Sequence, residues 1–312
     1  MEQVIRAFNE QAERLLYYSP YNYLRELGRH SHFNFLLNQL QLWLNQAANH
    51  FTFNIEINGA AYSFLYHFLP WDSDHFQVST CKLFTVLYPE NNFVDLVQAV
   101  AGFLKHLHSN NPGYFFGEIP AEDSLLLQAF TASGFRLSET RLNYYFDQVQ
   151  TFESERFPVR VAGKNDIDLI KKVASQNRNP FDRYHADIFF TPEQADNYLA
   201  TYAEACQKGL ADLVLLPGEN ERNSEAFMAI LRHKQDAEQL NTSFARILLT
   251  AVSPDCKGWH LKLASETIQF AKEWNTRYVL MTTQATNRAV FRTSEKLGFK
   301  LGSTTHLLSI TI

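Results

Sequence analysis

The segment Asn287-Arg-Ala-Val-Phe-Arg-Thr-Ser-Glu-Lys-Leu-Gly-Phe299 decides how the C-terminal part of this 312-residue chain folds. Asn287 can accept a hydrogen bond from an amide of the first helical turn and so begin a helix. Gly298 stands where a helix ends in a left-handed residue. The apolar runs at residues 278–283 and 301–312 predict buried strands on either side. The sequence therefore predicts a strand, a capped helix and a last strand, in that order.

An earlier part of the chain repeats this pattern. Residues 120–137 align without a gap to residues 284–301, and an amphipathic helical run and a strand precede each copy. The matched pairs, all separated by the same offset along the chain, are Asp123 with Asn287, Gly134 with Gly298, and Phe135 with Phe299. The same order of elements around the same helix cap and stop indicates two copies of one α/β unit. The alternative is that such caps and stops recur by chance.

The repeat divides the chain into three predicted parts. Residues 1–50 differ from both copies and are expected to be a helical extension, with helices at 1–16 and 33–49. Residues 51–150 carry the first copy and residues 151–312 the second. No functional motif stands out in the extension, so we expect it to serve packing.

The composition limits the classes of function. A formal charge of −5 gives no basic field for nucleic acid, and no run of eighteen apolar residues predicts a membrane span. The first residues lack the basic-then-apolar order of a signal peptide. The three cysteines, Cys81, Cys206 and Cys256, are scattered and odd in number, which favours a reducing cytoplasm. None stands at metal-ligand spacing from a His or another Cys, so we expect no metal.

The second copy shows a clear order of elements. A strand begins near residue 160 and a short helix follows at 165–174. Thr191 and Gln194 form a capping box that begins the next helix. Three strands are expected at 213–216, 227–232 and 244–252, with a polar loop at 234–243 between the last two. The predicted order is β-α-α-β-β-β-α-β-α-β.

This order and the Asn287–Phe299 frame resemble the GNAT superfamily of acyl-CoA N-acyltransferases. The resemblance implies an α/β (α+β) fold of tandem GNAT-like units, with a degenerate N-terminal half and a complete C-terminal domain. It also implies transfer of an acetyl group from acetyl-CoA to the primary amine of a small molecule. In that family a Tyr in the last helix often protonates the departing thiolate. Ser294 holds this position here, and Phe130, which cannot donate a proton, holds it in the first copy.

The resemblance also implies where coenzyme A binds. In the family the strand equivalent to residues 244–252 diverges from its neighbour and offers backbone groups to pantetheine, and a glycine-rich turn binds the pyrophosphate. The cofactor-binding positions it implies here are Leu249, Thr250, Ala251, Val252, Lys257, Gly258, Trp259, His260, Leu261, Lys262 and Asn287. His260 replaces a glycine of that turn and Lys262 a small residue. Their side chains could obstruct the phosphates or add donors to them.

A narrower resemblance covers residues 70–312. The segment Trp71-Asp-Ser-Asp-His-Phe76 and the order of residues 183–209 look like TDP-fucosamine acetyltransferases, which acetylate an amine of a nucleotide-linked sugar. This implies Arg178, Arg183, Tyr184 and His185 as ligands of the nucleotide diphosphate, since Arg matches phosphate oxygens. A solvated polar loop is the alternative. Tyr202 and Tyr278 are alternatives to Ser294 as the proton donor.

Three functions remain open at this stage. The first is the acetyltransferase, for which a homodimer is one of the states to test. The second is a catalytically impaired protein with the same fold that binds a ligand or a partner, because Ser294, His260 and Lys262 depart from the family pattern. The third is an acyltransferase that uses aminoacyl-tRNA, against which the net charge of −5 argues.

Overall fold

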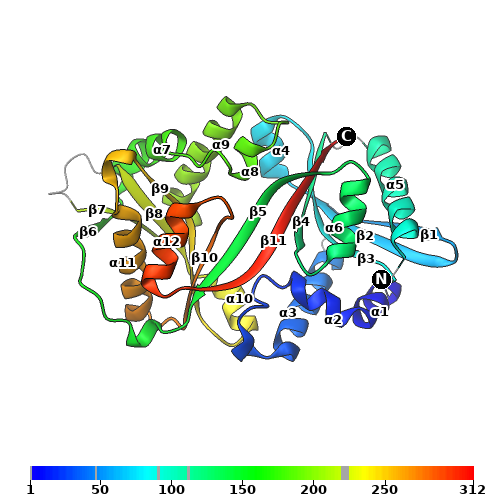
Figure 1. Ribbon diagram of the computed structural model, residues 1–312, viewed down its shortest axis with the longest axis horizontal. Helices are drawn as coiled ribbons and strands as arrows, with labels where there is room; N and C mark the ends of the chain where they lie inside the picture. The colour runs from blue at the N-terminus through cyan, green and yellow to red at the C-terminus, as the bar shows by residue number, and fades with distance from the viewer. Residues whose placement is uncertain (1, 46–47, 90–91, 111–112, 219–224) are drawn as a thin grey trace. The chain divides into compact units, whose positions relative to one another are not determined.

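The strand that follows each Gly-Phe stop pairs with a strand of the other copy (Figure 1). The last strand, β11 (Lys300–Thr311), pairs along most of its length with β4 (Tyr114–Pro120) of the first copy. In return, β5 (Arg136–Phe146) pairs with β10 (Tyr278–Gln284) of the second copy. The computed structural model describes residues 2–45, 48–89, 92–110, 113–218 and 225–312. Because of this pairing, the chain divides into unit 1 (residues 1–140 and 303–312) and unit 2 (residues 141–302). The division by sequence copy, at residues 50 and 150, stays a prediction.

Unit 1 has helices on a mixed sheet of order β1-β2-β3-β4-β11. Its other strands are β1 (His50–Ile57), β2 (Ala60–Phe68) and β3 (Thr80–Leu87). Its helices are α1 (Glu2–Glu10), α2 (Ala12–Leu15), α3 (Arg29–Asn45), α4 (Pro70–Phe76), α5 (Phe93–Asn110) and α6 (Ser124–Ala132). The core between the sheet and α5 and α6 is rich in phenylalanine, and Phe64 stacks on Phe103 with ring centroids 4.4 Å apart. Burial of such rings drives the packing of this unit.

Unit 2 has a sheet of order β5-β10-β9-β8-β7-β6. The strands are β6 (Val159–Val161), β7 (Leu213–Pro217), β8 (Ala226–Leu231) and β9 (Phe244–Val252), besides β5 and β10. The helices are α7 (Ile167–Gln176), α8 (Arg183–Ala186), α9 (Pro192–Ala205), α10 (Lys234–Gln239), α11 (Trp259–Glu273) and α12 (Arg288–Leu297). Met228 packs with α11 and the neighbouring Phe227 with α7, so alternate side chains of β8 serve two cores, one on each face of the sheet.

Two local expectations have opposite outcomes. The capping box is present, because Thr191 accepts from the amide of Gln194, whose side chain in turn accepts from the amide of Thr191. The polar loop expected at residues 234–243 is wrong, since α10 occupies most of it. Ala237 and Leu240 are buried there, and the burial of these two apolar side chains stabilises a helical turn in an otherwise polar segment.

The predicted caps and stops are confirmed in both copies. Asn287 accepts from the amide of Val290 at 3.2 Å, and Gly298 ends α12 with φ +82°. Asp123 likewise caps α6 by accepting from the amide of Leu126 at 3.3 Å. The stops match as well: the amide of Phe299 donates to the carbonyl of Ser294 at 2.9 Å, and that of Phe135 to Phe130 at 3.1 Å.

The repeat extends through the strand registers. In the parallel pairs, Thr80 lies opposite Tyr114, and Phe244 lies opposite Tyr278, at the offset that relates Gly134 to Gly298. The register of β2 on β3 shifts between Leu65 and Tyr66, and that of β8 on β9 shifts between Ala229 and Ile230, which is again the equivalent place. A β-bulge at the same place in both copies is a feature of their common construction rather than an accident of packing. The tandem arrangement predicted from the sequence is confirmed.

No helix in the described ranges is long and apolar enough to cross a membrane.

Candidate functional site

Two parallel strands of unit 2 diverge halfway along their length. The pairing of β9 with β10 runs from Phe244 opposite Tyr278 to Ile247 opposite Met281. Beyond that point β9 continues beside β8 as far as Val252, which lies opposite Ala226. The bulge after Ile247 bends β9 at the place where the two strands part. One edge of β9 is thereby left open.

Only alternate residues of β9 direct backbone groups to this open edge. The amide of Ser253 donates to the carbonyl of Glu225 at 2.8 Å, so odd-numbered residues here bond toward β8. Because backbone groups alternate between the two edges of a strand, Val252 and Thr250 face the opening. Of the four strand residues predicted to bind the cofactor, Leu249 and Ala251 bond toward β8, and Thr250 and Val252 offer their N–H and C=O groups to a ligand.

The first turn of α11 follows this edge. Gly258 precedes the helix with φ +97°, and among the described residues no side chain caps the helix there. The first hydrogen bond that closes a turn of α11 runs from the amide of Leu261 to the carbonyl of Gly258, at 3.1 Å. The amides of Trp259 and His260 precede it and take no part in this turn. Lys257 is exposed beside them. Free amides, the helix dipole and a lysine are what an anion such as a phosphate requires.

His260 has an unusual environment at this helix start. Both ring nitrogens are buried, and neither has a hydrogen-bond partner within the described chain. Burial lowers the pKa of His260 to about 4, so the imidazole is neutral at pH 7. A buried polar atom without a partner costs free energy that a bound ligand would recover. The two ring nitrogens are therefore candidates to contact a bound ligand.

Lys262 turns back on its own helix. Its Nζ lies 4.5 Å from the ring centroid of Trp259 and 5.8 Å from that of Phe157. Such a position is stabilised by the attraction of a cation to an aromatic face. The charge therefore stays within the first turns of α11.

The predicted proton donor is fully buried. Ser294 has no exposed surface, and its hydroxyl donates to the carbonyl of Val290 at 2.9 Å. This is the bond that a serine packed in a helix ordinarily makes. Of the two alternative tyrosines, Tyr278 is in the core, with its ring 6.2 Å from that of Phe244. Tyr202 of α9 instead packs against the same apolar cluster as Leu248 and Leu249 of β9.

The electrostatic surroundings of Tyr202 have opposing effects. Burial, together with Cys206 and Tyr198, raises the pKa of Tyr202 well above its ordinary value. The charges of Arg246 and Arg141 act in the opposite direction but do not cancel this effect. The phenol therefore stays protonated at neutral pH.

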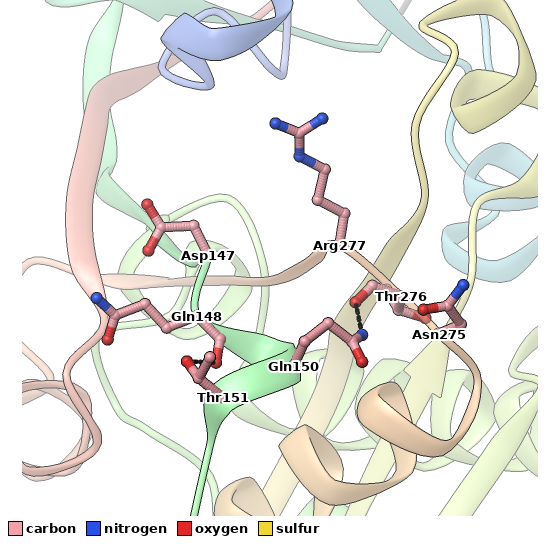
Figure 2. A pocket seen from close by; sticks show the side chains of 7 residues that line it. All are labelled: Asp147, Gln148, Gln150, Thr151, Asn275, Thr276 and Arg277. Atoms are coloured by element: carbon pink, nitrogen blue, oxygen red, sulfur yellow. Dashed lines mark hydrogen bonds between the residues drawn. The ribbon is translucent and has the colours of Figure 1, made fainter.

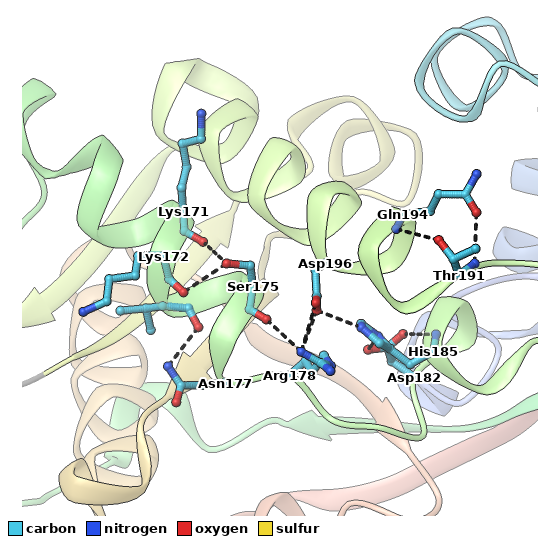
Figure 3. Close-up of polar contacts among 11 residues, drawn as sticks. Lys171, Lys172, Ser175, Asn177, Arg178, Asp182, His185, Thr191, Gln194 and Asp196 are labelled. Carbon is cyan, nitrogen blue, oxygen red and sulfur yellow. Dashed lines mark hydrogen bonds and ion pairs between the residues drawn. The ribbon is translucent and has the colours of Figure 1, made fainter.

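The predicted substrate residues lie on α8 and in the loop before it, and Figure 3 shows two of them, Arg178 and His185. Arg178 pairs with Asp196 at 2.8 Å, and the two ring nitrogens of His185 contact Asp182 at 2.7 Å and Asp196 at 3.1 Å. Arg183 lies with its guanidinium carbon 4.6 Å from the ring centroid of Tyr184. The structure brings all four predicted residues together, and it also adds two carboxylates that neutralise part of their charge.

A separate pocket of about 480 Å³ lies in unit 2, where β10 begins (Figure 2). Its lining residues are Asp147, Gln148, Gln150, Thr151, Asn275, Thr276 and Arg277. Gln150 donates to the carbonyl of Thr276 at 3.0 Å. The pocket is thus at the end of β10 opposite to the divergence. Within the described ranges, no group of three or more His, Cys, Asp or Glu residues could hold a metal ion.

Solved structures share this fold, although the sequences are distant. No protein-family model and no curated protein sequence matches the chain. A conserved protein of unknown function from Staphylococcus epidermidis is 13% identical, with a TM-score of 0.54 over 84% of this chain and 95% of that one. A GCN5-related N-acetyltransferase from Sphaerobacter thermophilus is 11% identical, with a TM-score of 0.52 over 81% of this chain and 80% of that one.

A third similar structure belongs to a larger protein. It is a fungal multi-domain GH3 β-N-acetylglucosaminidase with a GCN5-related glucosamine N-acetyltransferase region, 10% identical, with a TM-score of 0.59 over 88% of this chain and 34% of that one. Such low identities establish the arrangement of the backbone and nothing more specific. The chain has the fold of the GCN5-related N-acetyltransferases.

Proposed function

We propose that the protein is an N-acetyltransferase that moves an acetyl group from acetyl-CoA to the primary amine of a small molecule. The observation that carries the proposal is the divergence of β9 from β10 after Ile247, with an uncapped helix start directly beyond it. A peptide-like chain can add to an open strand edge, and a diphosphate can bind at a helix N-terminus. The two features meet in one place in unit 2.

Each part of the carrier has a matching group in the chain. The backbone of Thr250 and Val252 would bond the amides of pantetheine. The amides of Trp259 and His260, with the ammonium of Lys257, would hold the pyrophosphate, while the orphaned imidazole of His260 gains a partner. Asn287 would bond the pantetheine arm only by sharing the carboxamide that caps α12.

The chain's own groups must move two protons. The acceptor amine loses one as it attacks the thioester carbonyl, and the departing thiolate gains one. Amides at the open edge of β9 would stabilise the oxygen that becomes negative. Ser294 is the family's position for the proton donor, but its hydroxyl is committed to Val290. We therefore assign the donor role to the phenol of Tyr202, which packs against the same apolar cluster as Leu248 and Leu249 of β9, with Ser294 as the alternative.

For the acceptor we propose an amino sugar, linked to a nucleotide. The cluster supports this choice at Arg178, whose side chain is 35% exposed and can reach a phosphate, while the side chains of Arg183, Tyr184 and His185 are buried. One protein of the same fold carries a glucosamine N-acetyltransferase region, which makes free amino sugars the natural second set of acceptors to assay. Release of free thiol from acetyl-CoA, followed for both sets and for simple amines, identifies the class.

Calorimetry with acetyl-CoA tests the binding part of the proposal. Lys257→Glu is expected to weaken binding at least tenfold, because it replaces the cation at the pyrophosphate position by an anion. Lys105→Glu is the matched control, since Lys105 is also an exposed lysine but lies on α5 of unit 1. Equal weakening by both variants would point to net charge alone. Absence of binding by the natural protein at millimolar acetyl-CoA would exclude the function.

A second function is a ligand- or partner-binding protein of the same fold without catalysis. The buried, engaged hydroxyl of Ser294 favours it. Binding of acetyl-CoA without thiol release for any amine would support this reading, and turnover with any of them would remove it.

We also propose a cytoplasmic location, where the buried free thiols of Cys81, Cys206 and Cys256 stay reduced. Homodimer formation stays a prediction, which sedimentation equilibrium can decide.

A further inference from the structure

Unit 1 contains the counterpart of the open strand edge. The parallel pairing of β3 with β4 ends with Lys82 opposite Phe116, and β3 continues beside β2 to Leu87. By the offset that relates the two copies, Val86 corresponds to Thr250 and Tyr88 corresponds to Val252. These are the positions whose backbone groups face the divergence in unit 2. The first copy is therefore built with the same kind of groove.

In the first copy the N-terminal extension occupies these backbone groups. The side-chain oxygen Oε1 of Gln11 accepts from the amide of Tyr88 at 3.1 Å. Nη2 of Arg14 donates to the carbonyl of Val86 at 2.8 Å and to the same Oε1 of Gln11 at 2.5 Å. One side-chain acceptor and one side-chain donor thus satisfy the edge. A carboxamide and a guanidinium replace the peptide-like groups that an acyl carrier would present.

The same segment closes the groove at the cap of α6. Asp123 corresponds to Asn287, and its Oδ2 accepts from Nη1 of Arg14 and from the hydroxyl of Tyr18, both at 2.6 Å. The hydroxyl of Tyr88 donates to its other oxygen. The Arg14 side chain is 9% exposed and that of Asp123 is 1% exposed. A buried ion pair with this many hydrogen bonds is costly to break, because either charge alone would be left without compensation.

The helix start at the end of the groove is capped as well. Asp95 lies in the first turn of α5, the counterpart of α11. Its carboxylate accepts from the side-chain amide of Asn92 at 2.6 Å and from that of Asn58 at 2.9 Å. The amide of Asp95 itself donates to the side-chain oxygen of Asn92 at 3.1 Å, so Asn92 caps the start of α5, whereas no side chain caps the start of α11 among the described residues. Within the described residues of the first copy, the strand edge is therefore satisfied and the helix start is capped.

We propose that residues 11–18 are a built-in ligand of the first copy's groove, which closes unit 1 to acyl carriers. The segment lies across the positions where the proposed function places pantetheine in unit 2. It follows that the chain binds one acetyl-CoA, in unit 2. This number of bound carriers is the only part of the inference that rests on the proposed function. The role of the N-terminal extension is then to satisfy an inherited binding edge.

Hydrogen exchange of single backbone amides tests the occupancy of the groove without any ligand. In the natural protein the amide of Tyr88 is expected to exchange at least tenfold more slowly than that of Val252, because Gln11 accepts from Tyr88 while Val252 faces the open edge. Gln11→Ala is expected to accelerate exchange at Tyr88 at least tenfold. Glu10→Ala, a neighbouring exposed position, is the matched control and should leave it unchanged. Fast exchange at Tyr88 in the natural protein, or no effect of Gln11→Ala, would overturn the proposal.

Adding acetyl-CoA separates this inference from the proposed function. Slower exchange at Thr250 and Val252 with no change at Tyr88 supports both. Slower exchange at Tyr88 and Val86 as well would mean that the first copy takes the carrier, which overturns the built-in ligand. No change at either edge, with Tyr88 protected by Gln11, supports the built-in ligand and counts against the proposed function. Gln11→Ala keeps the ion pair of Arg14 with Asp123, so the variant is expected to fold.

Discussion

The hydroxyl of Ser294 donates to the carbonyl oxygen of Val290, 2.9 Å away and one turn earlier in α12. The residue at the family's proton-donor position is thus used inside its own helix. In the first copy the equivalent residue, Phe130, stacks on Phe135 with ring centroids 4.3 Å apart. Both copies fill this position with packing.

Replacement of Ser294 by alanine should therefore be mild. We expect Ser294→Ala to change the free energy of unfolding by at most about 1 kcal/mol, the net worth of one hydrogen bond, and to leave the rate of acetyl transfer unaltered. Ser294→Tyr should cost about 1–3 kcal/mol because a much larger side chain would have to fit at a fully buried position. Urea unfolding and steady-state kinetics measure the two effects. A tenfold loss of kcat in a Ser294→Ala protein of unchanged stability would return the donor role to Ser294.

Two left-handed glycines form a matched pair of test sites. Gly258 (φ +97°) and Gly59 (φ +80°) both have open space, with no heavy atom of the described chain within 4 Å of an added Cβ. Alanine at either should cost about 1 kcal/mol, since a Cβ strains the left-handed conformation. Only Gly258→Ala should also weaken acetyl-CoA binding, because its methyl group would enter the space left for the phosphates. Equal affinity of both variants in calorimetry would argue against a phosphate at the start of α11.

The two helix caps should differ in their contribution to stability. Asn287→Ala removes one cap bond and should lower the free energy of unfolding by about 1 kcal/mol. Asp123→Ala removes an equivalent cap and also leaves the guanidinium of Arg14 buried without its counter-ion, so it should cost about 3 kcal/mol or more. Equal losses in urea unfolding would contradict the network around Asp123.

Stability should fall in acid partly because of His260. Burial lowers its folded-state pKa to about 4, below the ordinary 6.5, so the unfolded chain binds this proton first as the pH drops. The stabilisation is complete above pH 6.5 and is lost as the pH falls toward 4. We expect the natural protein to lose about 2 kcal/mol more than His260→Gln between pH 7 and pH 4.5.

His67 gives this comparison an internal control. Burial lowers its pKa to about 4 as well, but it titrates equally in both proteins and cancels from the difference. Parallel pH profiles of unfolding for the two proteins would show that the imidazole of His260 is solvated.

The sequence alone determined the features whose hydrogen bonds join residues only a few positions apart. The caps at Asn287 and Asp123, the stops at Gly298 and Gly134, and the capping box at Thr191 are made by bonds between near neighbours, so residue type and spacing are sufficient to predict them. The repeat was also visible, since its constant offset is carried by those same local signals. Ser294 could be aligned with the proton-donor position, but the bond to Val290 could not be inferred from the alignment.

Only the tertiary structure decided which strand pairs with which. β5 and β11 have similar alternation and follow equivalent stops, so either could lie beside β4 or β10, and the exchange depends on long-range packing. The same holds for Gln11 and Arg14, whose partners Tyr88 and Val86 lie far away along the chain. An edge of β9 open at Thr250 and Val252 follows from a bulge and from the divergence of two strands. Neither the bulge nor the divergence produces a periodic pattern in the sequence, because both depend on how sheets twist and bend in three dimensions.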